Sequence, residues 1–422
     1  MIDNEQKITR ALLVSVDTGS YDAEASLDEL EELVKSAGAE PVLSLMQKLP
    51  RIESGTYVGT GKLQEIADIC KSQEIDLVVA DSELSPTQIK NMENATDVRV
   101  IDRTTLILDI FALRARSKEG KLQVELAQLK YLLPRLTGKG VEMSRLGGGI
   151  GTRGPGETKI ETDRRHIRRR METLRDELAE VEKHRQMLRR RREKDGVITC
   201  AIVGYTNAGK STLMNYLTDA GVLAQDKLFA TLDPTSRALK LPSGVSIMLI
   251  DTVGLVRRLP HHLVEAFRST LEEAAQSDII INLCDASGEE ARVHLQVTRD
   301  LLDSLGCGEK PVLTVLNKCD LLDGSVMAQD FDGYIKISAK TGEGVDDLLQ
   351  AIEDNLPVRM HRVSLLIPFA QAGLVNDIRQ SGTLLSEEYT PDGVAVEAVA
   401  DEQLYSKLRE FETDKDLKTN EL

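Results

Sequence analysis

The sequence lacks three features that would place the protein in a membrane, outside the cell or around a structural metal. No apolar run approaches 18 residues, and the opening MIDNEQKITR has no apolar core of the kind that a secretion signal needs. The five cysteines are scattered without a C-x-x-C pair, and several lie in apolar runs. We therefore expect a soluble cytoplasmic protein without membrane insertion, whose cysteines are small buried residues rather than metal ligands or disulfides.

At 422 residues the chain is longer than one ordinary core, and its length favours about three domains. The hydrophobic share of 41% is typical of a globular protein rather than a disordered one. The net charge of −16 argues against a nucleic-acid partner, but the charge is unevenly distributed. Residues 159–194 hold 14 Lys or Arg against 8 Asp or Glu, a local +6 that leaves −22 on the remainder. The basic residues are thus concentrated where they could contact phosphate.

Residues 8 to about 115 alternate short β-branched runs with amphipathic stretches, which is typical of a small parallel α/β domain. Strands are expected at residues 11–16, 41–46, 76–81 and 98–102, and helices at 22–38 and 61–73. A glycine-rich turn in residues 53–66 precedes the second of these helices. It could bind an anion at the helix N-terminus, but it has no G-K-[ST], so a simple strand-to-helix loop is the better interpretation.

Two long amphipathic segments follow, separated by a glycine-rich loop. In the first, apolar residues fall at 4-3-4 spacing, namely Leu122, Leu126, Leu129 and Leu133. In the second, the same rhythm runs through Ile167, Met171, Leu174, Leu178 and Val181, and Arg185 takes the next apolar position. The matching stripes predict an antiparallel helical hairpin with the loop at its tip. The arginine-rich second helix could carry a solvated face of ion pairs or a phosphate contact, and neither excludes the other.

The loop reads SRLGGGIGTRGPGETK, residues 144–159, and its six glycines predict neither a helix nor a regular strand. It contains G-x-G-x-x-G at Gly149, Gly151 and Gly154, a pattern found in dinucleotide-binding loops. The residues just upstream are polar and turn-rich, and no buried strand precedes the loop, so this interpretation is disfavoured. A flexible linker is the alternative that composition alone supports.

From residue 197 the pattern changes to an apolar strand, a turn and a helix, VITCAIVGYTNAGKSTLMNYL. The turn is G-x-x-x-x-G-K-S, with Gly204, Gly209, Lys210 and Ser211 in the strand-loop-helix context of a phosphate-binding loop. Backbone N–H groups can close on the phosphates, Lys210 can reach the β and γ oxygens, and the Ser211 hydroxyl can ligate Mg²⁺. The sequence therefore predicts binding of a nucleoside triphosphate.

Three further segments indicate which nucleotide is bound. VSIMLIDTVG delivers Asp251, suited to holding Mg²⁺ through water, and Gly254, whose N–H can contact the γ-phosphate. PVLTVLNKCD ends in N-K-x-D, and the carboxylate of Asp320 can accept from the N1–H and 2-amino groups of guanine. Adenine lacks the 2-amino donor and would leave this carboxylate unpaired. YIKISAKTGEG ends a strand at Ser338, Ala339 and Lys340, placed to contact the base from its other edge, so guanine is expected.

In type and order these segments resemble the motifs of Ras-like GTPases. The resemblance implies a switch threonine before the expected β-hairpin at residues 237–250, where the chain reads LFATLDPTSR; Thr231 is the candidate and Thr235 the runner-up. One departure concerns hydrolysis. Many GTPases place a glutamine after D-x-x-G to orient the attacking water, whereas this chain has Leu255, which can neither donate nor accept. We expect slow intrinsic hydrolysis, with the missing group supplied by a partner or by another residue.

Together with the segments upstream, the whole chain resembles the HflX family of ribosome-associated GTPases, which is related to Obg proteins. The resemblance rests on GGGIGTRGPGE, FATLDPT and DTVGL, on the α/β and helical segments before the G domain, and on a β-α-β-β-α tail after residue 360. It implies binding to the large (50S) ribosomal subunit, with GTP hydrolysis coupled to splitting, rescue or recycling of stalled ribosomes. It also implies that the loop enters a functional centre of the rRNA, with contacts from Arg145, Gly149, Gly151, Arg153 and Gly154.

The expected fold class is α/β. It comprises an N-terminal parallel α/β domain (1–115), a long helical hairpin (116–195), a Ras-like P-loop GTPase domain (196–359) and a small α+β C-terminal domain (360–422). GTP or GDP and Mg²⁺ are the expected cofactors. Some family members have been linked to ATP through the N-terminal part, but no second G-x-x-x-x-G-K-[ST] supports that here. We expect a monomer with no DNA partner.

Two alternatives stay open, a large-subunit assembly GTPase of the Obg type and a ribosome-binding module whose hydrolysis is incidental. The candidate catalytic residues are Lys210, Thr231 and Gly254, and the candidate metal ligands are Ser211, Thr231 and, through water, Asp251. The candidate nucleotide-binding residues are Gly204, Tyr205, Thr206, Asn207, Ala208, Gly209, Lys210, Ser211, Thr212, Phe229, Ala230, Thr231, Leu232, Asp233, Asp251, Thr252, Val253, Gly254, Asn317, Lys318, Cys319, Asp320, Ser338, Ala339 and Lys340.

Overall fold

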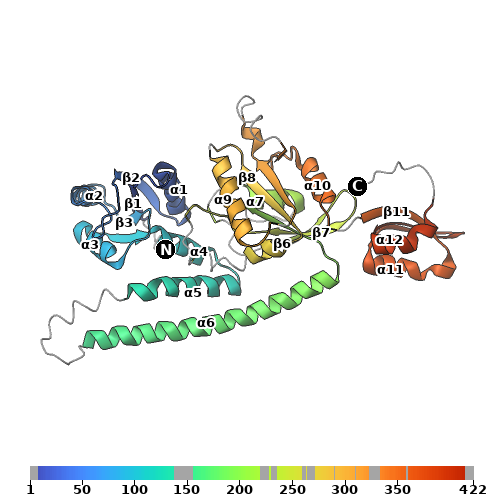
Figure 1. The fold of residues 1–422 in the computed structure, drawn as a ribbon, viewed down its shortest axis with the longest axis horizontal. Coiled ribbons are helices and arrows are strands. Elements are labelled where there is room, and N and C mark those ends of the chain that lie inside the picture. The colour runs from blue at the N-terminus through green and yellow to red at the C-terminus, as the bar shows by residue number, and fades with distance from the viewer. Residues whose placement is uncertain are drawn as a thin grey trace, which may run out of the picture. The chain divides into compact units, whose positions relative to one another are not determined.

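The structure is a computed structural model of the chain. It describes residues 8–136, 155–218, 228–229, 235–258, 263, 271–288, 290–308, 310–322, 333–357 and 360–413. The chain forms two compact units. The first holds residues 1–182 together with 225–233 and 256–268, and the second holds 183–224, 234–255 and 269–422. Each contains a parallel or largely parallel sheet with helices, and the predicted α/β class is confirmed (Figure 1).

The first unit begins with a four-stranded parallel sheet in the order β2-β1-β3-β4. Its strands are β1 (Arg10–Asp17), β2 (Glu40–Lys48), β3 (Leu77–Ala80) and β4 (Arg99–Asp102). The helices are α1 (Ala23–Ser36), α2 (Thr60–Ser72), α3 (Pro86–Thr96) and α4 (Arg103–Arg114). Six successive residues of β1 are buried, as expected for a central parallel strand covered on both faces. The predicted parallel α/β domain is confirmed, with α3 and α4 as additional helices.

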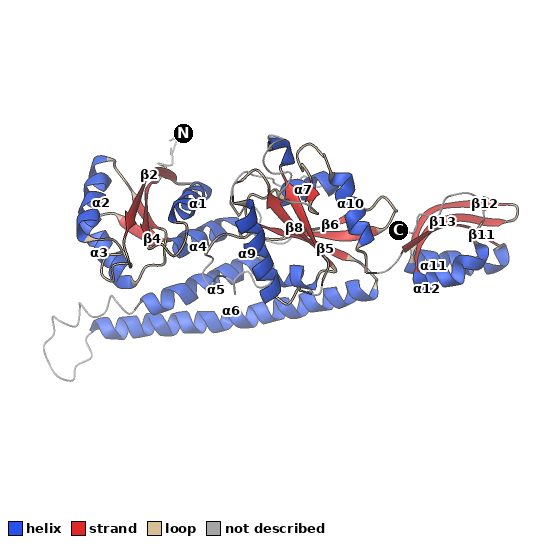
Figure 2. Ribbon diagram, turned by 45° about the horizontal axis from the view of Figure 1, so that its top comes forward, coloured by secondary structure: helices blue, strands red, loops and turns tan. Residues whose placement is uncertain are grey.

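Two further helices lie side by side and antiparallel, α5 (Lys118–Arg135) and α6 (Pro155–Lys194), as Figures 1 and 2 both show. Met171 and Leu174 of the predicted stripe are buried, and Arg170 donates to both oxygens of Glu125 at 2.7 and 2.8 Å. The expectation that residues 144–159 hold no helix was wrong for the last five. Helix α6 begins at Pro155, because proline is tolerated in a first helical turn, where its missing N–H has no partner to lose.

The second unit contains a six-stranded sheet in the order β10-β9-β8-β5-β7-β6, in which β6 alone pairs antiparallel with its neighbour. Its strands are β5 (Thr199–Gly204), β6 (Thr235–Lys240), β7 (Ser246–Asp251), β8 (Ile279–Asp285), β9 (Val312–Asn317) and β10 (Ile335–Lys336). Helices α7 (Lys210–Thr218), α9 (Ala291–Ser304) and α10 (Val345–Asp354) accompany it, with a helical stretch at 271–276. In α/β sheets of this kind, ligands bind among the loops that follow the carboxyl ends of the parallel strands, so a ligand site is expected there.

The tail forms a three-stranded antiparallel sheet in the order β11-β13-β12 (Figure 2). The elements are β11 (Met360–Ile367), α11 (Gly373–Ser381), β12 (Thr383–Thr390), β13 (Gly393–Asp401) and α12 (Glu402–Leu408). Short 3₁₀ turns precede α11 (η3, Phe369–Gln371) and follow α12 (η4, Arg409–Phe411). The predicted β-α-β-β-α order is confirmed.

The cysteines lie where apolar packing places them. Cys70, Cys200, Cys284 and Cys307 are buried and Cys319 is half-buried, which confirms the prediction for four of the five. Burial raises the pKa of the Cys70 thiol to about 11 and that of Cys200 and Cys284 to about 12. These thiols stay protonated at neutral pH. Within the described part of the chain, none of the helices has the length and apolar character required to cross a membrane.

Candidate nucleotide-binding site

The phosphate-binding loop runs between the end of β5 and the start of α7, as the sequence predicted. Gly209 has a φ of +91°, and a Cβ placed on it would lie 2.2 Å from Nδ2 of Asn317. Only glycine fits this position, because both the left-handed backbone and the close neighbour exclude a side chain. Asn207, with a φ of 62°, takes a second left-handed position, which asparagine tolerates better than most residues. The loop therefore wraps tightly in front of the helix N-terminus.

Lys210 is buried inside this loop. Its Nζ donates to the carbonyl oxygens of Gly204 at 3.1 Å and Tyr205 at 2.8 Å. Burial lowers the pKa of Lys210 to about 8, and the negative charge of Asp251 opposes part of that shift. A buried ammonium that donates to carbonyl oxygens favours an anionic ligand, because an anion would compensate its lost hydration.

Two oxygen-bearing side chains lie together beside the loop. Ser211 Oγ is 2.9 Å from Asp251 Oδ2, and Asp251, at the end of β7, is fully buried. Thr252, next in the chain, donates from Oγ1 to the carbonyl of Ile202 at 2.7 Å and so fixes the end of β7. Hydroxyl and carboxylate oxygens are hard donors that fit Mg²⁺. The ion would be held by Ser211 and, through water, Asp251, and when bound it neutralises phosphate charge.

The D-x-x-G segment packs directly on the phosphate loop. Leu255 donates its N–H to the carbonyl of Gly204 at 3.2 Å and accepts from Thr206 N–H at 2.8 Å. A Cβ on Gly254 would lie 2.8 Å from Thr206 Cα and 3.1 Å from Lys210 Nζ, so only glycine allows this approach. Within the described residues, the buried Oγ1 of Thr206 has no hydrogen-bond partner. This geometry fits a γ-phosphate cradle, and Leu255, itself buried, supplies no polar group to it.

The expected base-binding segments meet through Asn317, at the end of β9. Its Nδ2 donates to the Ala208 carbonyl at 2.8 Å, and its Oδ1 accepts from Ala339 N–H at 2.9 Å. One side chain thus ties the phosphate loop to the segment at Ser338 and Ala339. The amide carries a second Nδ2 hydrogen, which could donate to a ligand.

The remaining predicted base contacts differ in exposure. Lys318 pairs with Asp285 at 2.7 Å, and Cys319 and Asp320 belong to the 3₁₀ turn η2 (Cys319–Leu321). The Asp320 side chain is exposed, so a guanine base could reach its carboxylate from solvent. Ser338 is fully buried, whereas Lys340 is exposed.

Some of the predicted residues do not belong to the described part of the chain. Ala230, Thr231, Leu232 and Asp233 lie outside the described residues, and so do Arg145, Gly149, Gly151, Arg153 and Gly154 of the loop before α6. Phe229 belongs to the first unit, where its ring meets Phe111 edge-on at 4.7 Å. Thr235, the runner-up switch threonine, starts β6 and is half-buried.

Sequence reasoning missed one residue beside the phosphate loop. The imidazole of His294, on α9, stacks on the ring of Tyr205 with centroids 3.8 Å apart and planes 13° from parallel. An isolated histidine on an amphipathic helix carries no recognisable motif, so no sequence signal pointed to it. Only the fold brings α9 alongside the loop that follows β5.

A strand-loop-helix phosphate cradle, a D-x-x-G turn packed against it and an N-K-x-D segment tied to it define a P-loop GTPase. Three family models match the chain: GTP-binding GTPase N-terminal over residues 24–112, GTP-binding GTPase Middle Region over 114–192, and 50S ribosome-binding GTPase over 199–318. The chain belongs to the HflX GTPase family. It is a GTP hydrolase that binds guanine nucleotides.

Curated relatives named GTPase HflX match the chain over nearly their whole length. The chain is 51% identical over 411 residues to the GTPase HflX of Lacrimispora saccharolytica, with 97% of each chain covered. It is 42% identical over 401 residues to the GTPase HflX of Escherichia coli, with 93% of each covered. A GTP-binding protein from Sulfolobus solfataricus, solved in complex with GDP, is 27% identical with a TM-score of 0.44, covering 82% of this chain and 98% of that one.

Proposed function

We propose that the chain is a GTPase switch that acts on the large ribosomal subunit in the cytoplasm as a monomer, splitting, rescuing or recycling stalled ribosomes. The match of residues 199–318 to a family described as 50S ribosome-binding GTPase carries this proposal. The absence of a hydrogen-bonding group at Leu255 adds to it, since an enzyme that cannot orient water alone is suited to stimulation by a partner.

We assign the work of the site to a few residues. Lys210 and Gly254 would hold the β and γ phosphates, and Thr231 would close on the γ-phosphate. Ser211 and Asp251 would hold Mg²⁺, as described above. Asn317 and Asp320 would read the guanine edge, with the Ser338 segment on the other side of the base. These assignments rest on the contacts among the phosphate loop, the D-x-x-G segment and Asn317.

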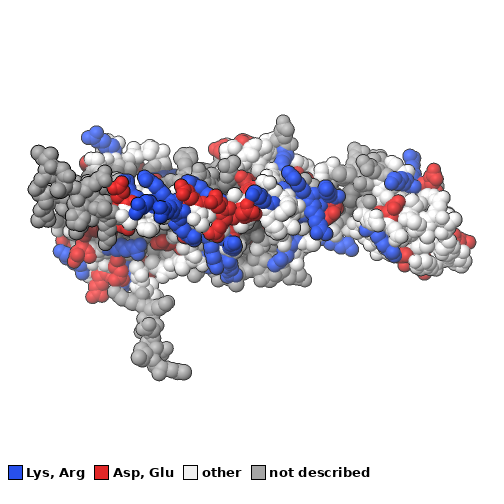
Figure 3. All heavy atoms as spheres, turned by 90° about the horizontal axis from the view of Figure 1, so that it is seen from below, with Lys and Arg blue, Asp and Glu red and all other residues white. Residues whose placement is uncertain are grey.

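The RNA-binding surface is proposed along the hairpin and its tip. Exposed arginines of α6 include Arg165, Arg168, Arg169 and Arg175. Figure 3 views the face that carries this helix and shows Lys and Arg side chains gathered there among Asp and Glu. Phosphate contacts of this kind give salt-sensitive binding. The glycine-rich tip, with Arg145 and Arg153, would make the close approach to rRNA.

In domain terms, we propose that residues 1–115 and 116–195 form the parts that precede the G domain at 196–359, with residues 360–422 as a separate C-terminal domain. Two other functions remain as competitors. An assembly GTPase would prefer immature subunits, and a nucleotide-tuned binding module would bind subunits without faster hydrolysis.

The test is GTP turnover of the purified chain with and without purified large subunits. We expect at least about a tenfold rise in kcat with mature subunits. Deletion of residues 146–156 should abolish the rise while leaving turnover without subunits unchanged. As a matched control, Arg362→Ala removes an exposed arginine from the C-terminal sheet, where it pairs with Glu397, and should keep the stimulation. Stimulation that survives the loop deletion would contradict the role of the tip, and binding without stimulation would favour the module.

A further inference from the structure

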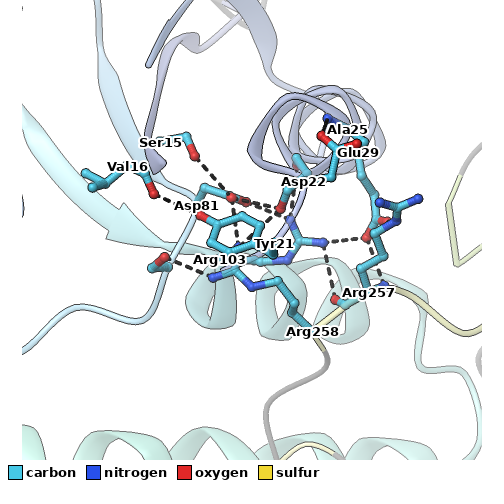
Figure 4. Close-up of polar contacts among 12 residues, drawn as sticks. Ser15, Val16, Tyr21, Asp22, Ala25, Glu29, Asp81, Arg103, Arg257 and Arg258 are labelled. Carbon is cyan, nitrogen blue, oxygen red and sulfur yellow. Dashed lines mark hydrogen bonds and ion pairs between the residues drawn. The ribbon is translucent and has the colours of Figure 1, made fainter. Parts of the chain in front are cut away.

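The first unit contains a buried acidic cluster of side chains, centred on Asp81 and Glu29, that neither GTP binding nor the proposed ribosome contact explains. Asp81, which follows β3, is fully buried and accepts from Ser15 Oγ at 3.4 Å and Ser26 Oγ at 2.8 Å. Arg103, at the start of α4, donates to Asp81 at 2.8 Å and also pairs with Glu29 of α1. Figure 4 shows Asp81, Glu29 and Arg103 converging from the end of β3, from α1 and from α4. The two carboxylates of Asp81 and Glu29 outnumber the one guanidinium of Arg103, so this cluster carries a net negative charge.

Two arginines of the segment that follows DTVGL contact this acidic cluster. Arg258 donates from one Nη to Asp81 at 3.0 Å and to Ser26 at 3.2 Å, and from the other Nη to Ser82 at 3.0 Å. Its guanidinium also lies 3.9 Å from the centroid of the Tyr21 ring. The neighbouring Arg257 donates its backbone N–H to Glu29 at 3.2 Å, and its guanidinium lies 3.8 Å from the same carboxylate (Figure 4). The planar guanidinium of Arg258 thus has hydrogen-bond acceptors around its edge and an aromatic ring against its face.

The groups of the acidic cluster are buried, whereas the arginine that contacts them is partly exposed. The side chains of Asp81 and Arg103 are 0% and 3% exposed, but that of Arg258 is 33% exposed. Arg258 also has a φ of 48°, a left-handed conformation that a non-glycine residue holds only when its surroundings impose it. Once released, the backbone could relax, so the docked and released states are two distinct arrangements.

A second segment is held by the same unit in a similar way. Phe229 has a φ of 56°, its ring packs edge-on against Phe111, and Leu228 donates its N–H to Ser36 Oγ at 3.0 Å. Both held segments lie next to residues assigned to the γ-phosphate. Thr231 is two residues beyond Phe229, and Gly254 is three residues before Arg257. Three residues of chain span at most about 11 Å, so an anchored Arg257 limits where Gly254 can move.

We propose that Asp81 and Glu29 are a receptor for Arg257 and Arg258, and that docking of these arginines restrains the D-x-x-G segment and slows intrinsic GTP turnover. The restraint acts because Gly254 must follow the γ-phosphate as the reaction proceeds, and a chain anchored three residues away resists that movement. This inference rests on the proposed role of Gly254, and it does not require a ribosome.

The test is single-turnover GTP hydrolysis by the full chain without ribosomal subunits. Arg258→Ala should raise the rate at least about fivefold, and Arg258→Lys should raise it less, because an ammonium keeps the charge but loses the fork of donors. Asp81→Asn should raise the rate as well, and adding Arg258→Ala to it should give little further change, as two residues of one contact are not additive. Arg362→Ala changes a residue outside the acidic cluster and should leave the rate unchanged. Because Asp81 is buried, the Asp81→Asn rate is compared only if thermal melting of that variant stays cooperative. If it does not, the rate of Arg258→Ala alone tests the proposal.

A second measurement does not depend on turnover. Hydrogen exchange at the backbone amide of Arg257 should be faster with a non-hydrolysable GTP analogue than with GDP, because its bond to Glu29 is broken more often. An unchanged or lower rate in folded Arg258→Ala, or exchange equal with both nucleotides, would overturn the proposal. If Gly254→Ala hydrolysed GTP normally, the assignment of the site would fail instead, so the two failures are distinguishable.

Discussion

Replacing Asn317 by alanine should weaken guanine-nucleotide binding more than its base contact alone explains. Asn317 is 2% exposed, and its side chain holds the Ala208 carbonyl at 2.8 Å and the Ala339 N–H at 2.9 Å. Truncation leaves both groups without these partners, and each orphaned buried group costs about 1–3 kcal/mol. The tether between the phosphate loop and the base-binding segment is lost as well. The two groups together cost about 2–6 kcal/mol. If roughly 2–4 kcal/mol of this falls on the nucleotide-bound state, the Kd for GDP is about 30- to 1000-fold weaker.

A neighbouring strand offers the matched control. Asn282, on β8, is also 2% exposed, but its Oδ1 has no hydrogen-bond partner within the described part of the chain. Asn282→Ala therefore removes the same atoms from the same sheet with a smaller loss of hydrogen bonding. Equilibrium titration with a fluorescent GDP should show a loss of affinity for Asn317→Ala and nearly normal affinity for Asn282→Ala. Equal losses in the two variants would refute the reasoning, because general damage to the sheet would then explain both.

Two further predictions concern the phosphate loop. The pKa of Lys210 is lowered to about 8 and bound phosphate must raise it, so nucleotide binding at pH 8.5 should take up about three-quarters of a proton. The affinity is therefore fully present below pH 8 and falls as the pH rises above it; calorimetry in buffers of different ionisation heat measures the uptake, and pH-independent binding between pH 7 and 9 would contradict it. Gly254→Ala should slow single-turnover hydrolysis at least about tenfold, since its Cβ would lie 2.8 Å from Thr206 Cα. The control is Gly288→Ala, whose Cβ meets no atom within 4 Å, and equal rates in the two variants would count against the close approach.

The parts of the fold that follow from local pattern could be predicted. The strand that ends at Gly204 is apolar, the turn after it needs glycine, and α7 begins at the lysine, so one short stretch specifies the phosphate loop. The order of elements in the tail after residue 360 could also be predicted, because clear turns separate its strands and helices. Helix α3 was not predicted, since its residues are mostly polar and its start depends on a capping box between Ser85 and Gln88.

Contacts between distant segments could not be predicted. The carboxylate of Asp81 and the guanidinium of Arg258 are 177 positions apart, and neither belongs to a motif. Arg185 shows the same limit. The sequence placed it where an apolar residue was expected, and the structure gives the reason: its guanidinium lies 3.4 Å from Glu272, which belongs to the same unit. The tether through Asn317 likewise depends on how β9 lies beside the phosphate loop, which periodicity does not encode.

The assignment of guanine specificity to Asp320 is tested most directly by changing the hydrogen-bonding sense of that one side chain. Guanine offers donors at N1 and at the 2-amino group, whereas xanthine has a carbonyl acceptor in place of the amino group. Hydrolysis of GTP and of xanthosine triphosphate is to be measured side by side for the unaltered chain and for Asp320→Asn. We predict that kcat/KM for GTP falls by roughly 10²–10³-fold in the variant while that for xanthosine triphosphate rises. Unchanged preference for GTP in a folded Asp320→Asn variant would contradict the account of the site.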